Sequence, residues 1–170
     1  DSNVALNNMY SSLLYVSSKI RDIDIKILLE TSSGQGSEMC ISLQELSNFI
    51  NKLLKHKNKN ISDKFGICVD TCHIFNAGYN LNTPKDVYNY FKEFDEKIDV
   101  KNIKVIHLNN SKTDLGSKID RHENLEIGKI KLEGIKEIIK FCYKLDILIV
   151  LETPDQFIEN DLEIIREIWK

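Results

Sequence analysis

Phe65-Gly-Ile-Cys-Val-Asp-Thr-Cys-His73 is the stretch of sequence that decides the fold class. It contains a short apolar strand, Phe65–Val69, which ends on Asp70 and is followed three residues later by His73. Continuous apolar strands of this length are typical of parallel sheets that are buried on both faces. Three other apolar stretches end at a carboxylate or carry an imidazole, namely Ile25–Leu29 before Glu30, Ile103–Leu108 with His107, and Ile147–Leu151 before Glu152.

Helical segments precede, separate and follow these four strands. The first, residues 4–20, is predicted to be amphipathic, with an apolar face made of Val4, Met9, Leu13, Leu14 and Val16. The alternation predicts an α/β fold with a parallel sheet in one domain over residues 1–170, either half of a (β/α)8 barrel or a small open sheet. The later helices are predicted to begin at Ser42 with Glu45 as a capping box, at Thr83 with Pro84 in the first position, near residues 131–143, and at Asn160 before a helix that runs to Trp169.

The composition is that of an ordinary globular domain. Hydrophobic residues make up 42% of the chain, and a net charge of −3 does not indicate nucleic-acid binding, although a local basic surface suffices for it. The apolar runs are much shorter than a membrane span, so no membrane contact is expected. The first residue is Asp1 rather than Met, which indicates a fragment or a processed product. No cysteine pair forms a C-x-x-C motif, and free thiols in a reducing compartment are predicted for Cys40, Cys68, Cys72 and Cys142.

Each of the four predicted strands has, at or near its C-terminal end, an Asp, Glu or His whose side chain can bind a metal ion. In parallel α/β folds these ends meet where ligands bind. Taken singly, His107 would be interpreted as a core histidine and Glu152 as a helix cap. Together the side chains would repel one another unless divalent cations neutralised them, and carboxylate and imidazole ligands favour zinc or manganese. The residues concerned are Glu30, Asp70, His107 and Glu152.

Two local motifs extend this set of candidate metal ligands. Asp70 and His73 lie three residues apart just beyond a strand, so both are expected to face one pocket. Asp120 and His122 lie on either side of Arg121, two positions apart, so both side chains point the same way if that segment is extended. The sequence therefore predicts a second group of ligands, made of His73, Asp120 and His122, beside the first.

Five stretches of the chain resemble the endonuclease IV family, in the family's order and at family-like spacings. The resemblance covers Glu30 to Pro154, and the Asp-Arg-His triplet is among its most specific features. It implies that the chain is the C-terminal half, strands five to eight, of a (β/α)8 TIM barrel whose N-terminal half is absent. The stretches are Glu30-Thr-Ser-Ser-Gly-Gln-Gly-Ser37, Cys68-Val-Asp-Thr-Cys-His-Ile-Phe-Asn-Ala-Gly-Tyr79, His107-Leu-Asn-Asn-Ser-Lys112, Gly116-Ser-Lys-Ile-Asp-Arg-His-Glu-Asn124 and Leu151-Glu-Thr-Pro154.

The resemblance implies a centre of three zinc ions, with manganese as the alternative metal. Glu30 is implied to bridge two of the ions, and Glu152 to help orient the attacking water, which makes these the expected catalytic residues. Two histidines of the first zinc site come from barrel strands that this chain lacks, so that site is expected to be incomplete. The remaining ligands are implied to be Asp70, His107 and Glu152 for the second zinc, and His73, Asp120 and His122 for the third.

The implied reaction is hydrolysis of the phosphodiester 5′ to an abasic site in double-stranded DNA, which leaves a 3′-hydroxyl and a 5′-deoxyribose phosphate. Cations of one long loop are expected to contact DNA phosphates, with solvated loop charges as the alternative. Thr31 and Asn110 depart from the family pattern, and neither is expected to touch a metal ligand. The loop cations are Lys112, Lys118, Arg121 and Lys129.

The sequence is also compatible with two other interpretations of function. A metal-dependent sugar isomerase or epimerase of the xylose isomerase-like class shares the barrel and most ligand types, but it leaves Asp120 and His122 unexplained. The chain is alternatively a non-catalytic half-barrel, inactive alone, whose partner is an N-terminal half-barrel or a second copy. A repair enzyme is expected inside the cell, and the sequence leaves nucleus, organelle and cytoplasm open.

Overall fold

The computed structural model describes residues 1–169, and its centre is a parallel sheet of four strands. In sheet order these are β1 (Ile27–Glu30), β2 (Phe65–Asp70), β3 (Ile103–His107) and β6 (Leu148–Val150), and every neighbouring pair is parallel. β2 is buried at every position, whereas the outer strands β1 and β6 contain exposed and half-buried residues. β2 is thus covered on both faces, whereas β3 contains the exposed Lys104 and the two edge strands are partly open.

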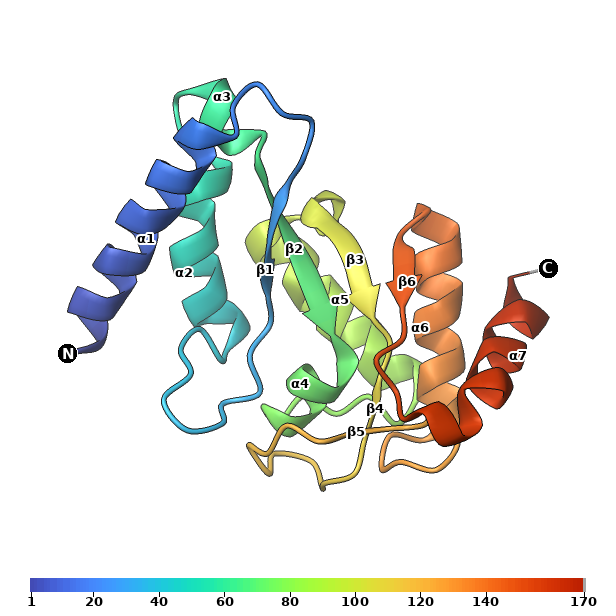
Figure 1. The fold of residues 1–170 in the computed structure, drawn as a ribbon. Helices are drawn as coiled ribbons and strands as arrows, with labels where there is room; N and C mark the ends of the chain where they lie inside the picture. Colours follow the sequence, from blue (N-terminus) through green and yellow to red (C-terminus); the bar gives the residue numbers. More distant parts are fainter. Residues whose placement is uncertain (170) are drawn as a thin grey trace.

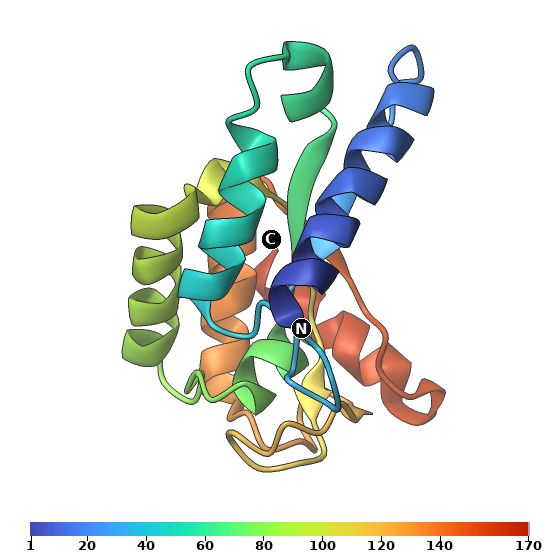
Figure 2. The same cartoon turned by 90° about the vertical axis from the view of Figure 1, so that its left-hand side faces the viewer.

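Helices cover one face of this sheet, and further helices lie beside its two edge strands (Figures 1 and 2). On the covered face, α2 (Leu43–Leu54), α5 (Pro84–Ile98) and α6 (Leu132–Leu145) lie side by side. At the ends lie α1 (Ser2–Lys19), near β1, and α7 (Ile158–Ile168), which packs against α6. The shorter elements are α3 (Lys59–Ser62), α4 (Thr71–Asn76), η1 (Val100–Asn102), η2 (Asp155–Phe157), and an antiparallel pair, β4 (Asn110–Ser111) and β5 (His122–Glu123).

The predicted helix starts at Ser42 and Thr83 are confirmed. The Ser42 hydroxyl accepts the backbone N–H of Glu45 at 3.2 Å, and the Glu45 carboxylate accepts the backbone N–H of Ser42 at 3.0 Å. Thr83 forms the same capping box with Asp86, and Pro84 is the first residue of α5. Both caps satisfy backbone donors that a helix leaves unpaired at its N-terminus, which explains why local sequence locates these starts.

Two details of the predicted helices are wrong. Asn160 does not cap the last helix, because η2 winds directly into α7, which already begins at Ile158. Val4, Met9 and Val16 do not form the buried face of α1, since their exposed fractions are 56%, 38% and 44%. Leu13 and Leu14 do pack on the core, as predicted, and they belong to a stripe of residues about one helical turn apart that also includes Leu6 and Tyr10.

Gly134 lies inside α6, where sequence alone favours alanine, since glycine destabilises a helix interior by about 1 kcal/mol relative to alanine. In the structure a Cβ at this position would lie 1.7 Å from the carbonyl oxygen of Leu81. A backbone atom cannot swing aside as a flexible side chain does. We therefore expect Gly134→Ala to lower the free energy of unfolding by about 2–3 kcal/mol.

Denaturant unfolding of the variant measures this change in stability. Lys140→Ala, at an exposed position on the same helix, is the control and should change the free energy of unfolding by no more than about 0.5 kcal/mol. A Gly134→Ala protein as stable as the unsubstituted one would contradict the close approach of α6 to Leu81.

Two further expectations from the sequence concern membrane contact and thiols. Within residues 1–169, no helix is both long and apolar enough to cross a membrane. All the cysteines are free thiols, as predicted. Three of them are buried, namely Cys68, Cys72 and Cys142, while Cys40 is half-buried.

Candidate metal centre

The C-terminal ends of the strands converge at one edge of the sheet, as is general for parallel α/β folds. Asp70, at the end of β2, pairs directly with His107, at the end of β3. This pairing depends on a register shift after Ile67, where β3 contributes an additional residue. Without the shift Asp70 would be opposite Ile106, and His107 would point to the other face of the sheet. The irregularity therefore aims both side chains at one place.

The first group of candidate ligands, defined as Glu30, Asp70, His107 and Glu152, gathers around the His107 ring. Their ligand atoms all lie within 4.8 Å of one another. The Nδ1 atom of His107 is 3.0 Å from Glu30 Oε1 and 3.0 Å from Glu152 Oε2. It is also 3.9 Å from Asp70 Oδ2. Three carboxylates thus surround a single imidazole, and this excess of negative charge suits a divalent cation.

The second group, defined as His73, Asp120 and His122, brings together the two remaining motifs. Asp120 Oδ2 lies 3.1 Å from Nε2 of His73, and Asp120 Oδ1 lies 3.2 Å from Nε2 of His122. Asp70 Oδ2 is only 3.6 Å from the same His122 nitrogen. Asp70 therefore faces both groups, which agrees with the pocket expected for Asp70 and His73, whereas the family resemblance implied Asp70 only as a ligand of the second zinc.

The tautomers of the two histidines in the second group follow from their partners. Nδ1 of His73 lies 2.8 Å from the carbonyl oxygen of Thr31, and Nδ1 of His122 lies 3.3 Å from that of Glu152. A carbonyl oxygen only accepts, so in each neutral ring Nδ1 carries the proton and Nε2 presents its lone pair. Both Nε2 atoms are buried and have no hydrogen-bond partner among the described residues.

In the neutral rings these nitrogens face carboxylate oxygens, so acceptors meet acceptors with no donor between them. Leaving a buried polar atom without a partner lowers the stability of the fold by about 1–3 kcal/mol. A cation bound by both Nε2 atoms would remove this penalty for the two histidines together. The donor set of imidazole nitrogens and carboxylate oxygens therefore fits a divalent metal ion.

Burial also shifts the protonation equilibria at this edge of the sheet. It raises the pKa of Asp70 above its ordinary value, despite the opposing effect of His73 nearby. Burial alone would lower the pKa of His73, but Asp70 and the Thr31 carbonyl outweigh it and raise that pKa. Burial raises the pKa of Cys72 to about 11, and its Sγ accepts the Asn76 amide at 3.1 Å. The Cys72 sulfur nevertheless lies within 4.8 Å of ligand atoms of Asp120 and His122, beside the second group.

One expectation about the departures from the family pattern is wrong. Thr31 does contact candidate ligands, because its hydroxyl accepts the backbone N–H of Asp70 at 3.0 Å and its carbonyl meets His73. Thr31 lies on the segment that follows β1, and no local pattern could place it beside residues about forty positions later. Asn110 agrees with the expectation, since its side chain bonds to backbone atoms of its own loop.

Sequence reasoning missed two further residues of the centre. Asn109 bonds to two candidate ligands, and Gln35 accepts the backbone N–H of Asp120 at 3.0 Å. Both lie inside the stretches that resemble endonuclease IV. Their position inside those stretches could have identified them as site residues. Asparagine and glutamine are not usual ligands of zinc or manganese, however, so neither was predicted to belong to the centre.

The predicted DNA contacts divide into two kinds. Lys112 is 3.9 Å from Glu123, and Lys129 is 3.2 Å from Asp114, so neighbouring carboxylates partly neutralise both. Arg121 and Lys118 form no ion pair with the other described residues. Contact with DNA stays a prediction for these exposed side chains of the loop between β3 and α6, which are Lys112, Lys118, Arg121 and Lys129.

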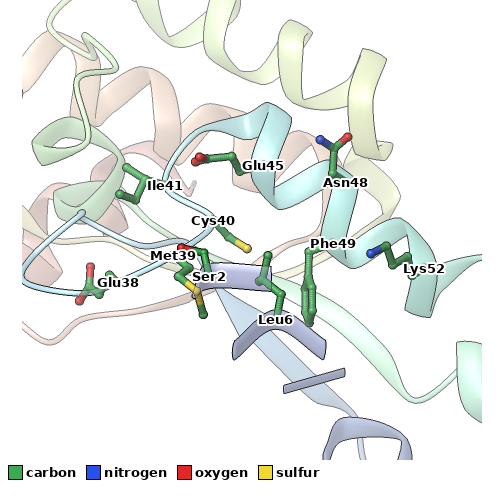
Figure 3. Close-up of a pocket in the computed structure, with 10 residues that line it drawn as sticks. All are labelled: Ser2, Leu6, Glu38, Met39, Cys40, Ile41, Glu45, Asn48, Phe49 and Lys52. Carbon is green, nitrogen blue, oxygen red and sulfur yellow. The ribbon is translucent and has the colours of Figure 1, made fainter. Parts of the chain in front are cut away.

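A cavity of about 270 Å³ lies apart from this centre, between α1, α2 and the segment before α2 (Figure 3). No candidate metal ligand lines it, so it is separate from the two groups. Its lining residues are Ser2, Leu6, Glu38, Met39, Cys40, Ile41, Glu45, Asn48, Phe49 and Lys52.

Comparison with known proteins identifies the family of this chain. The profile of the family described as "Xylose isomerase-like TIM barrel" matches residues 1–168. The chain belongs to this family. Among its relatives, "Apurinic-apyrimidinic endonuclease 1" of Plasmodium falciparum (isolate 3D7) is 43% identical over 84% of this chain and 23% of that protein. The "Probable endonuclease 4" of Nitrosopumilus maritimus (strain SCM1) is 41% identical over 85% of this chain and 50% of that protein.

A solved structure of the same kind gives a consistent result. Endonuclease IV from Thermus thermophilus matches with a TM-score of 0.66 and 29% identity, over 83% of this chain and 47% of that one. The chain therefore spans about half the length, or less, of these xylose isomerase-like relatives. The predicted resemblance to endonuclease IV and the predicted α/β half-barrel are confirmed.

Proposed function

We propose that the complete protein is a zinc-dependent endonuclease that cuts double-stranded DNA 5′ to abasic sites, leaving a 3′-hydroxyl and a 5′-deoxyribose phosphate. The observation that carries the proposal is the second group, where the buried Nε2 atoms of His73 and His122 face the Asp120 carboxylate. Ligands beyond the first group support a multinuclear centre. The names of the relatives, an apurinic-apyrimidinic endonuclease and a probable endonuclease 4, support the choice of substrate.

Each side chain has a role that its position supports. Glu30 Oε1 lies 3.0 Å from His107 and belongs to the first group, and its side chain is 38% exposed, so this carboxylate has room to reach a second ion at the incomplete first zinc site, as a bridging ligand requires. The Glu152 side chain is 45% exposed, so it can contact a water molecule and a ligand at once. Arg121 and Lys118 would hold DNA phosphates without reading sequence. Bound zinc ions would supply Lewis-acid activation of the phosphodiester and lower the pKa of the attacking water.

The alternative reaction is a metal-dependent sugar isomerisation or epimerisation, whose active site needs one or two ions. The second group counts against this reaction, because Asp120 and His122 would then be ligands without a metal. The alternative of a non-catalytic half-barrel leaves both groups without a purpose. Metal count per complete protein separates the nuclease, with three ions, from the isomerase.

The test compares two histidine variants in the complete protein. His122→Asn should lose zinc from the second group and lower cleavage of abasic-site DNA by at least about 100-fold, or roughly 3 kcal/mol. His56→Asn is the matched control, since His56 belongs to neither group and its Nδ1 accepts only the backbone N–H of Asn58. Zinc content is measured by mass spectrometry of the metal, and cleavage with a duplex that carries one abasic site.

Three outcomes would contradict the proposal. The first is a His122→Asn protein that keeps the full zinc content and activity. The second is a complete protein with three zinc ions that leaves abasic-site DNA intact. The third is isomerisation of a sugar at one or two ions per protein, which would establish the alternative reaction.

A further inference from the structure

Asn109 lies two residues beyond the end of β3, and its side chain is fully buried between β2 and the segment after β6. Its Nδ2 donates to Asp70 Oδ2 at 2.7 Å and lies 3.3 Å from Glu152 Oε2. Its Oδ1 accepts the backbone N–H of Glu152 at 2.8 Å. One amide thus contacts two carboxylates that come from strands on opposite sides of β3.

The orientation of this amide is determined by its partners. The backbone N–H of Glu152 can only donate, so the oxygen of Asn109 must face it. The NH₂ group then necessarily points at Asp70 and Glu152, whose carboxylate oxygens are acceptors. An amide nitrogen is a donor without a lone pair for a metal, so Asn109 cannot replace a ligand through this atom.

The backbone of Asn109 is held as firmly as its side chain. The Thr71 hydroxyl accepts the Asn109 N–H at 2.9 Å and donates to the Asn109 carbonyl oxygen at 2.6 Å. Thr71 is the first residue of α4, directly after Asp70. Asn109 is therefore fixed to the same turn that carries the first carboxylate, and it reaches from there to the second.

We propose that Asn109 is a positioning residue that holds Asp70 and Glu152 in the arrangement that binds metal at the first group. The inference rests on the metal-binding part of the proposed function. Side chains that hydrogen-bond to metal ligands restrict the ligands before the ion arrives, and their loss commonly weakens metal binding about 10- to 100-fold. Asn109 has two ligands to restrict, so we expect the effect of its removal on zinc affinity to lie in that range.

The test measures zinc affinity of the complete protein by competition with a chromophoric chelator. Asn109→Ala should weaken binding of the ion at the first group by about 10- to 100-fold. Asn109→Ser is the second variant, because its hydroxyl partly replaces the lost hydrogen bonds and preserves folding, yet it is too short to reach both carboxylates. The absorption spectrum of the cobalt-substituted protein should also change, since it reports ligand geometry directly.

Asn110→Ala is the matched control. Asn110 is the next residue, is equally buried, and bonds through the same kind of amide, but only to Leu125, Ile130 and Ser111 in its own loop. It should lose comparable stability while zinc affinity at the first group stays within about twofold, as expected for a site without ligand contacts. Equal zinc affinity and equal cobalt spectra in the Asn109 and Asn110 variants would overturn the proposal.

The outcome is independent of catalysis. If the unsubstituted protein binds zinc but does not cut abasic-site DNA, the proposed reaction fails, while weaker zinc binding by the Asn109 variants still supports the positioning role. If the unsubstituted protein binds no divalent cation, both proposals are overturned.

Discussion

Glu152→Gln is expected to lower cleavage of abasic-site DNA by the complete enzyme by about 100- to 1000-fold, or roughly 3–4 kcal/mol, with DNA binding partly retained. The change removes one charge and nearly preserves the shape of the side chain. Glu152 Oε2 is 3.0 Å from His107, and its backbone carbonyl lies 3.3 Å from Nδ1 of His122. The substitution therefore alters the carboxylate of the first group and leaves the backbone contact to the second.

DNA binding should survive in part because phosphate contacts commonly supply much of the affinity for DNA, and the loop cations are predicted to make them. Glu126→Gln is the control, since Glu126 is an exposed carboxylate on the loop between β3 and α6 and belongs to neither group. Rates are compared in metal-replete buffer, and DNA binding is measured separately by fluorescence anisotropy. Near-normal cleavage by Glu152→Gln would remove Glu152 from the catalytic residues.

The isolated 170-residue chain is expected to associate in solution and to cut abasic-site DNA very weakly or not at all. Its sheet ends at β1 and β6, and within residues 1–169 no further strand pairs with either edge. These are the first and the last of the four strands predicted from the sequence. Each presents unpaired backbone groups and apolar side chains such as Leu148, which is 62% exposed.

An open strand edge offers its backbone donors and acceptors to another strand, and pairing there would also remove the exposed apolar side chains from water. The chain should therefore pair through its open edges with a second copy, or with the N-terminal half-barrel that the family resemblance implies. Its first zinc site should also lack the two histidines that the resemblance assigns to absent strands. Both features predict loss of activity in the isolated chain.

Light scattering and an abasic-site cleavage assay on the purified chain test this prediction. Leu148→Lys places a charge on the β6 edge and should reduce association. Tyr88→Lys, at a 64% exposed position on α5, is the matched control and should not. A stable monomer with full activity would contradict both the half-barrel interpretation and the three-zinc mechanism.

The sequence by itself determined the order of the elements and the candidate ligands. Apolar runs, capping boxes at Ser42 and Thr83, and a charged residue at each strand end are local patterns, and local patterns can be read without coordinates. Parallel strands then place their C-terminal ends at one edge as a general property of the fold. For this reason Glu30, Asp70 and Glu152 could be grouped before any distance was known.

The tertiary structure alone decided how these side chains meet. The register shift in β3 sets His107 opposite Asp70, and that carboxylate reaches both groups rather than one. Thr31 and Asn109 contact ligands about forty residues away, and the face of α1 and the crowding at Gly134 likewise depend on distant neighbours. Helical and strand periodicity describe only which side of an element is apolar. Which distant atom lies against a side chain is settled by packing in three dimensions.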